Sequence, residues 1–489
     1  MRTLLFAFSL SCGIAILAAE KPNFIVINID DMGYADIGPF GSKLNRTPHL
    51  DRMAKEGCKL TSYYAAPSCS PSRAALMTGC YPKRVLPIPG VLFPAAAVGL
   101  NLKSPTIAEV LKPAGYTTGC IGKWHLGDQP PFLPTRRGFD YYLGIPYSND
   151  MGLASEGSKS SLGDKLPEPR LTNLTGNDEA GLRGMSQPPL PLLENEKVIA
   201  RVKQDEQQGI VERYTTAAVK FIKANRNKSF FLYLPHNAVH FPIYPGKKWA
   251  GKSPNGIYSD WVEEVDWSVG QVLDTLRELK LDKKTLVIFT SDNGGTQRAV
   301  NAPLRGFKGS TWEGGMREPT IAWWPGKVPA GTTCDAITGM IDILPTLAAL
   351  AGAKLPNSKI DGVNIWPHLC GKADGKPAHE TFYYYRGLKL EAIRHGPWKL
   401  RFASAADPAA KGGGKKRPKA QPNSDQLYNL ATDIGETTDV AAANPEIVKK
   451  LQAIATAMEN DLGTKDTGPG CRELGRVTNP QPLIPHDHK

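Results

Sequence analysis

The sequence predicts an α/β fold: a large, mostly parallel mixed β-sheet flanked by helices, followed by a smaller C-terminal α+β domain. Short apolar runs of the buried-strand type recur as far as about residue 360. Amphipathic helical patterns lie between these runs, and this alternation is typical of parallel sheets covered on both faces. Beyond Asp361 the strand-like runs become short and closely spaced, which indicates a second, smaller domain.

The N-terminus has the features of an export signal. Met1-Arg2 is followed by an apolar stretch from Leu4 to Leu17 and by the small residues Ala18-Ala19, so we expect a signal peptide over residues 1–19. The stretch is shorter than the ~20 residues of a spanning helix, and no comparable stretch follows. We therefore expect an exported protein, periplasmic or secreted, with no transmembrane segment. A lipid anchor on Cys12 is an alternative, although the preceding residues fit a lipoprotein cleavage site badly.

The predicted strands of the first domain end in ionisable residues, and helical patterns separate them. The helical pattern at 262–279 places Val and Leu at spacings of three and four, which gives one apolar face. In parallel sheets the ligand crevice lies at the carboxyl ends of the strands, so we expect these polar endings to converge. In chain order the strands and their endings are 24–29 before Asp30 and Asp31, 116–121 before Lys123 and His125, 230–234 before His236 and His240, and 285–289 before Asp292 and Asn293.

Two of these endings together indicate a cation site. The adjacent carboxylates of Asp30 and Asp31 would repel each other unless a cation lay between them. Asp292 and Asn293 add further oxygen atoms at a second strand end. Ligation by oxygen alone is the preference of calcium or magnesium, whereas zinc or copper would favour His and Cys.

The smaller domain is predicted over residues 361–489, after a first domain over 20–360. Its expected strands are 381–385, 391–394 and 398–402, and its expected final helix is 445–462. A tract near 404–424, rich in Ala, Gly, Pro and Lys, predicts a mobile basic loop. A polar, Pro-rich stretch over 155–191 predicts a long surface excursion near the crevice.

Charge and cysteine content narrow the classes of function. The 489 residues are 41% hydrophobic and 22% charged, as in ordinary globular proteins, and 59 Lys+Arg against 47 Asp+Glu gives a net charge of +12. This charge suits a polyanionic partner, but no nucleic-acid-binding motif accompanies it. Seven of the eight cysteines lie outside the signal, an odd number for an exported protein. We expect Cys58 and Cys120 to be core residues, and the pairing of the others stays open.

The segment from Cys69 to Gly79 resembles the signature of the type I sulfatases in the alkaline-phosphatase superfamily. Its defining pattern is Cys69-x-Pro71-Ser72-Arg73 followed by Leu76-x-Thr78-Gly79. The resemblance implies an alkaline-phosphatase-like fold and oxidation of Cys69 to formylglycine by a dedicated maturation enzyme. The hydrate of this aldehyde would then supply the nucleophile, and Cys69 would be the odd thiol.

Further motifs extend the resemblance from Pro22 to about Leu462, and the block from Gly144 to Ser148 resembles the arylsulfatase A branch. The resemblance implies three sets of site residues. The catalytic set is Cys69, Arg73, Lys123, His125, His240 and Lys308. The substrate-binding set is Lys123, Ser148, His240 and Lys308. The metal set, for calcium or magnesium, is Asp30, Asp31, Cys69, Asp292 and Asn293.

These residues suit the hydrolysis of a sulfate monoester. Lys123, Lys308 and the cation would offset the negative charge of the sulfate, with a hydrogen bond from Ser148. His240 would protonate the leaving alcohol, and His125 would take a proton as sulfate departs. Taken singly, each lysine would be a surface residue and each histidine a structural one. His236 has no match in the family pattern and is left out, and Trp124 is assigned to packing.

Two other functions remain as alternatives. One is a phosphonate or phosphodiester hydrolase of the same superfamily, although its second metal motif generally has histidine where this chain has Asn293. The other is a glycan-binding protein in which Cys69 is never converted. The expected substrate is a sulfated saccharide or an aryl sulfate, with the saccharide favoured by export and by the positive net charge.

Overall fold

The computed structural model describes residues 21–167, 175–184, 187–405 and 424–485. The predicted signal peptide and most of the predicted basic loop therefore lie outside the described residues. Within these ranges, no helix combines the length and apolar character needed to cross a bilayer.

The core of the molecule is a ten-stranded mixed sheet with the strand order β10-β9-β6-β5-β11-β1-β12-β13-β2-β14. Its central strands, from β6 to β12, are parallel, and antiparallel strands pair on either side of them. The bounds are β1 Asn23–Ile29, β2 Cys58–Leu60, β5 Thr117–Ile121, β6 Tyr141–Gly144, β9 Pro191–Glu194, β10 Lys197–Arg201, β11 Phe230–Pro235, β12 Thr285–Ser291, β13 Thr320–Trp323 and β14 Thr332–Cys334.

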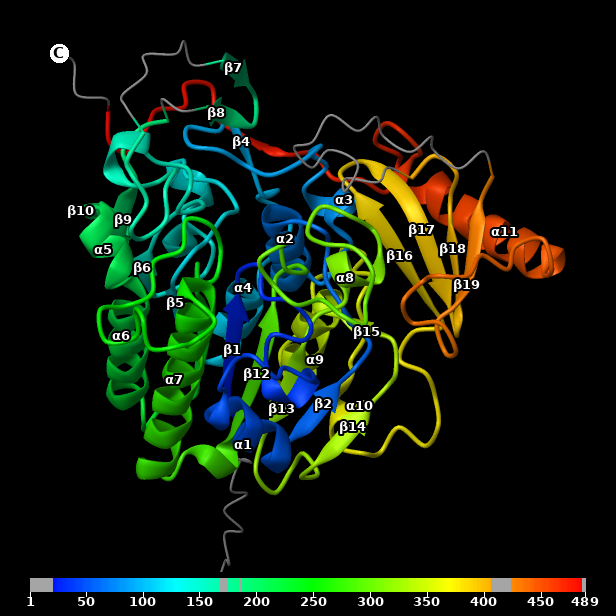
Figure 1. Ribbon diagram of the computed structural model, residues 1–489, viewed down its shortest axis with the longest axis horizontal. Helices are drawn as coiled ribbons and strands as arrows, with labels where there is room; N and C mark the ends of the chain where they lie inside the picture. Colours follow the sequence, from blue (N-terminus) through cyan, green and yellow to red (C-terminus); the bar gives the residue numbers. More distant parts are fainter. Residues whose placement is uncertain (1–20, 168–174, 185–186, 406–423, 486–489) are drawn as a thin grey trace, which may run out of the picture.

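Helices cover both faces of this sheet, as predicted (Figure 1). Successive residues of β1 alternate between two cores: Phe24 and Val26 belong to one, and Ile25 and Ile27 to the other. The first core also contains residues of α2, α4 and α9, and the second contains residues of α1, α6 and α7. The bounds are α1 Pro48–Glu56, α2 Cys69–Thr78, α4 Ile107–Leu111, α6 Ile210–Ala224, α7 Ile257–Glu278 and α9 Ile343–Ala351.

A separate four-stranded antiparallel sheet follows at the C-terminal end, with the order β16-β17-β18-β19. Figure 1 shows it beside the large sheet, with α11 on its outer side. This confirms the predicted α/β architecture with a smaller C-terminal α+β domain. The bounds are β16 Thr381–Arg386, β17 Lys389–His395, β18 Trp398–Arg401, β19 Gln426–Asn429 and α11 Pro445–Leu462.

The described part of the 155–191 excursion contains a small hairpin of β7 Thr175–Asp178 and β8 Gly181–Arg183. Backbone hydrogen bonds hold this hairpin against the chain near Phe93. The amide of Phe93 donates to Ala180 O at 2.7 Å, and the amide of Leu182 donates to Pro94 O at 2.8 Å. The excursion is thus fixed next to Leu92, whose carbonyl contacts one of the predicted site residues, His125.

Candidate active site

The predicted site residues meet at the carboxyl ends of the central strands. Each strand end contributes because parallel neighbours finish at the same edge of the sheet. Cys69 and Arg73 come from the start of α2, and Lys308 comes from the segment before the short helix α8, Glu313–Met316. The strand-end residues are Asp30 and Asp31 after β1, Lys123 and His125 after β5, Ser148 after β6, His240 after β11, and Asp292 and Asn293 after β12.

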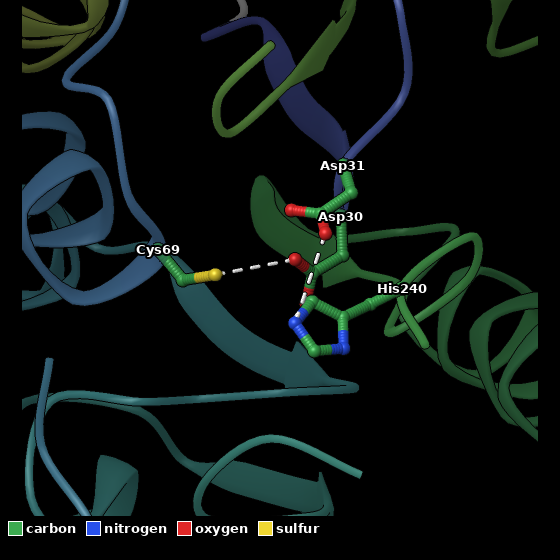
Figure 2. A group of neighbouring side chains, drawn as sticks. All are labelled: Asp30, Asp31, Cys69 and His240. Carbon is green, nitrogen blue, oxygen red and sulfur yellow. Dashed lines mark hydrogen bonds and ion pairs between the residues drawn. The ribbon is translucent and has the colours of Figure 1, made fainter. Parts of the chain in front are cut away.

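Four of these side chains form a compact cluster, shown in Figure 2. One ligand atom each from Asp30, Asp31, Cys69 and His240 lies within 4.8 Å of the others. The Cys69 Sγ donates to Asp30 Oδ1 at 3.3 Å, and His240 Nε2 lies 3.7 Å from Asp31 Oδ2. The three sequence motifs that carry these residues are therefore brought to one point.

Helix α2 presents Cys69 as its first residue and Arg73 one turn later. The Arg73 side chain is fully buried, and it donates from Nε and Nη2 to Asp292 Oδ2 at 2.9 and 2.8 Å. Its Nη1 donates to the carbonyl oxygen of Lys123 at 2.6 Å. Arg73 thereby fixes α2 against the ends of both β12 and β5.

Two lysines from different segments of the chain bring positive charge to the cluster. Lys123 Nζ is fully buried, contacts Asp30 Oδ2, and donates to Ser148 Oγ at 3.2 Å. Lys308 Nζ lies 2.6 Å from Asp31 Oδ1 and donates to Cys69 Sγ at 3.4 Å. With its side chain 21% exposed, Lys308 is the more accessible of the two.

The two histidines differ in their hydrogen bonding. His125 Nε2 lies 2.8 Å from Leu92 O, and because a carbonyl only accepts, Nε2 carries the proton. Its buried Nδ1 has no hydrogen-bond partner among the described residues and is thus a free acceptor. His240 Nδ1 contacts Phe241 O and lies 3.4 Å from Ser148 Oγ. His240 therefore directs Nε2 toward the carboxylate cluster.

Burial and charge set the protonation states of these groups. Burial alone would raise the pKa of Asp30, but Lys123 and other nearby cations hold it well below its usual range. Burial, reinforced by Asp292 and Asp30, raises the pKa of the Cys69 thiol well above its ordinary value, so the thiol keeps its proton. Burial, with Lys123, lowers the pKa of His125 well below its usual value, which leaves the imidazole neutral.

The oxygen atoms at the two strand ends fit a hard cation. Asn293 Nδ2 donates to Asp31 Oδ1 at 2.7 Å, while the buried Asn293 Oδ1 has no hydrogen-bond partner among the described residues. A buried carboxamide oxygen without a donor is costly unless a cation or water satisfies it. Together with the carboxylates of Asp30, Asp31 and Asp292, it forms the donor set that calcium or magnesium prefers.

Sequence reasoning overlooked Asp150, which lies two residues after Ser148. Its carboxyl group interacts with His240, Lys159 and Lys123 and is hydrogen bonded to Ser148. Nothing in the local sequence distinguishes it from an ordinary turn aspartate. His236, the histidine without a match in the family pattern, has its Nε2 3.2 Å from Ser268 Oγ.

The remaining residues singled out in the sequence are structural. Trp124 is fully buried and donates from Nε1 to Phe132 O at 2.8 Å, in keeping with the packing role expected for it. Cys58 and Cys120 are buried core residues, also as expected. All seven described cysteines are free.

Comparison with known proteins identifies the family. Residues 22–353 match the sequence model of the sulfatase family, and residues 377–475 match the C-terminal region of aryl-sulfatase. The chain is 37% identical over 480 residues to arylsulfatase A of Homo sapiens, covering 93% of this chain and 90% of that protein. It is 31% identical over 520 residues to N-acetylgalactosamine-6-sulfatase of Canis lupus familiaris, covering 96% and 94%.

A solved structure described as Ps i-CgsB in complex with k-i-k-neocarrahexaose is also similar. It has a TM-score of 0.72 and 31% sequence identity, covering 92% of this chain and 96% of that chain. The fold, the matched motifs and the relatives all agree. The chain therefore belongs to the sulfatase family and is a hydrolase of sulfate esters.

Proposed function

We propose that this protein is an exported sulfatase that hydrolyses sulfate monoesters of saccharides, with a formylglycine formed from Cys69 and one bound divalent cation. The observation that carries the proposal is the position of Cys69. Its Sγ lies at the first turn of α2, 3.3 Å from Asp30 Oδ1 and 3.4 Å from Lys308 Nζ. A nucleophile formed at this position would lie between the carboxylate cluster and a cationic side chain.

The positive groups around Cys69 suit a sulfate ester, which is a stable anion. Lys123 and Lys308 would contact the sulfate oxygens, and Ser148 would donate a further hydrogen bond. A bound calcium or magnesium ion, held by Asp30, Asp31, Asp292, Asn293 and residue 69, would supply further positive charge. Arg73 would hold residue 69 and Asp292 in place through its fixed guanidinium.

The two histidines suit the two proton transfers of the reaction. A formylglycine at position 69 supplies a hydrated aldehyde, whose two hydroxyls provide the nucleophile and the route by which sulfate is released. His240 would protonate the leaving alcohol oxygen as its bond to sulfur breaks. His125, neutral and with Nδ1 free, would take a hydroxyl proton as the aldehyde forms again and sulfate departs.

Saccharides are the proposed alcohols. One relative is an N-acetylgalactosamine-6-sulfatase, and one similar structure holds a neocarrahexaose. The net charge of +12 would attract polyanionic glycans. The sulfate contacts cannot distinguish one alcohol from another, so specificity would come from the variable segment over 155–191.

Sulfate release tests this proposal. The protein, produced with a formylglycine-generating maturation enzyme, is assayed on sulfated galactose, glucosamine and fucose oligosaccharides and on an aryl sulfate. The phosphate and phosphonate esters of the same phenol are included. We expect sulfate release from at least one sugar class, and faster cleavage of the aryl sulfate than of the phosphorus esters because Asn293 replaces a histidine.

Three outcomes would count against the proposal. Faster phosphonate cleavage would favour the phosphonate hydrolase, and intact sugars beside a cleaved aryl sulfate would remove the saccharide claim. Retention of the glycan without cleavage, by protein in which Cys69 stays an unmodified thiol despite the maturation enzyme, would favour the binding protein. Cation content is tested separately by metal analysis, where we expect about one hard cation per chain.

A further inference from the structure

We propose that Asp150 is a specificity-determining residue that accepts a hydrogen bond from a hydroxyl of the substrate alcohol, on a carbon next to the one that bears the sulfate. This inference rests on the proposed function and deepens it, because it names the kind of alcohol that the site selects. It concerns a residue to which the proposed sulfate chemistry assigns no part.

The segment that carries Asp150 is held firmly beside the sulfate site. Asn149 is buried, and its Nδ2 donates to Pro242 O at 3.2 Å and to His240 O at 3.5 Å. The amide of Met151 donates to Ser148 O at 2.9 Å, which closes a turn around Asp150. The turn therefore keeps a fixed position relative to both Ser148 and His240.

The same turn is tied to the excursion over 155–191. Lys159 Nζ contacts the carbonyl oxygen of Asp150 and donates to Gln187 Oε1 at 2.7 Å. Gln187 Nε2 in turn donates to Leu182 O of β8 at 3.0 Å. Asp150 thus stands between the shared sulfate contacts and the segment expected to differ between sulfatases of different specificity.

The carboxylate of Asp150 has an unused acceptor. Its Oδ1 is buried and has no hydrogen-bond partner among the described residues. Burial alone would raise the pKa of Asp150, but His240, Lys159 and Lys123 lower it below its ordinary value. The group is therefore an ionised carboxylate, which accepts hydrogen bonds and donates none.

Substrate binding would make this acceptor more important. In the structure, Lys123 and Ser148 interact with Asp150, and a bound sulfate would take up both of these groups. The sulfate would also place a second negative charge near the Asp150 carboxylate. An anionic carboxylate left without a donor next to a bound sulfate is unfavourable. The leaving oxygen faces His240, so a hydroxyl on the neighbouring carbon is the donor best placed to satisfy Asp150. Sugars sulfated at a secondary ring position carry such a hydroxyl, and simple phenols do not.

A competing explanation is that Asp150 only orients His240. That role would affect every substrate to the same extent, because each leaving oxygen needs the same proton. The hydroxyl contact would affect only substrates that carry the hydroxyl. A comparison of two matched substrates therefore separates the explanations.

The test compares Asp150→Asn with the wild-type enzyme and with Asp205→Asn, a matched change at an exposed position on α5, Gln204–Gln208. The substrates are the methyl glycoside, sulfated at a secondary ring carbon, that the wild type cleaves best and its analogues deoxygenated at each neighbouring carbon that bears a hydroxyl. We expect Asp150→Asn to lower kcat/KM on the hydroxyl-bearing sugar about tenfold to a hundredfold more than on one deoxy analogue. Asp205→Asn should match the wild type on all substrates.

An equal loss on all substrates would overturn the inference and assign Asp150 to His240, while leaving the saccharide sulfatase intact. Equal activity of wild type and Asp150→Asn on every substrate would also overturn it. A wild-type enzyme that cleaves an aryl sulfate but none of the sugars would instead refute the proposed function, and the inference with it. Circular dichroism and metal content of each variant confirm that the fold and cation are retained.

Discussion

Asp31 and His125 both adopt left-handed backbone conformations, with φ of 62° and 64°. Such conformations are rare outside glycine and cost about 1–3 kcal/mol. Asp31 lies two residues after β1, and His125 lies four residues after β5. The packing of the two cores holds these conformations in place, so the positions of the site residues depend on the whole sheet.

Replacing Cys69 by alanine tests the nucleophile. Position 69 could then not be converted, and we expect sulfate release to fall at least about 10³-fold. Peptide mass spectrometry of the wild type from a host with the maturation enzyme should show the aldehyde. Cys370→Ala, a change at a partly buried cysteine outside the site, should retain activity. A fully active preparation that carries an unmodified thiol at Cys69 would contradict the mechanism.

Replacing Asn293 by alanine tests whether this residue is a ligand of the proposed cation. Asn293→Ala removes the buried Oδ1 that has no hydrogen-bond partner among the described residues. We expect this variant to bind its cation about tenfold or more weakly, because a hard cation loses one oxygen ligand. Metal analysis after dialysis against graded chelator measures the loss, and Asn227→Ala, at an exposed position, serves as the control. Equal metal retention in the two variants would exclude Asn293 as a ligand.

At the scale of the elements, the sequence predicted the central strands better than the outer ones. The runs that became β1, β5, β11 and β12 are buried on both faces, so their apolar character is continuous. The strands β10 and β14 are short and partly exposed, and their patterns resemble loops. The β7–β8 hairpin was missed because the polar excursion shows no periodicity.

The segment that presents Lys308 is held by the C-terminal domain. Lys399 Nζ, on β18, is fully buried and contacts Thr311 O at 2.9 Å, Glu313 Oε1 at 2.9 Å and Glu436 Oε1 at 2.7 Å. Trp312 lies between two guanidinium groups, those of Arg305 at 3.7 Å and Arg401 at 4.1 Å from its ring. One buried cation thus joins the small domain to a loop of the candidate active site.

Lys399→Met is therefore expected to destabilise the protein. Removal of the cation deprives the buried Glu436 of its ion pair and takes one cation from Glu313, which keeps Arg317 as a partner. Breaking a buried ion pair in this way costs roughly 3–5 kcal/mol. We expect a lower Tm and a lower kcat/KM, because the loop that carries Lys308 loosens. Differential scanning fluorimetry and sulfate release measure both effects, with the exposed Lys449→Met as the control. An unchanged Tm would show that the network contributes little.

Helix α7 contains a buried carboxyl that should make stability depend on pH. Burial raises the pKa of Glu264 to about 8, although its Oε2 accepts the amide of Gly246 at 2.7 Å. The folded state then holds a proton that the unfolded state releases above its ordinary value of 4.5. Stability from this group is present below that value and is lost as the pH rises through about 8.

Glu264→Gln mimics the protonated carboxyl and should remove this dependence. We expect its Tm to exceed that of the wild type by about 2 °C or more near pH 9 and to approach it near pH 5. Thermal melts across this range measure the difference. Glu278→Gln, at an exposed position on the same helix, should follow the wild type. A constant offset at every pH would contradict the assignment.

At the scale of the whole molecule, the order of the motifs was the most informative feature of the sequence. The sequence spacing between Asp30, Cys69, His240 and Asp292 does not show how close these residues lie in space. The parallel sheet brings their segments to one edge. The alternation of buried strands and amphipathic helices predicted that sheet in advance, and the resemblance agreed with it. Asp150 could not be predicted because its importance depends on neighbours from three other segments. The domain boundary near residue 360 stays a prediction.

The net charge of the molecule leads to a last prediction, on salt dependence. With 59 basic and 47 acidic side chains, the protein would attract a polysulfated chain over distances longer than any contact. At 0.15 M salt the screening length is about 8 Å, so this attraction weakens steeply as salt is added. We expect kcat/KM on a sulfated polysaccharide to fall about tenfold between 0.05 and 0.5 M sodium chloride. A small aryl sulfate carries one charge, so its kcat/KM should fall much less. Sucrose at equal osmolality controls for solvent effects. An equal fall of kcat/KM on both substrates would contradict the long-range attraction and would limit the effect of salt to the sulfate pocket.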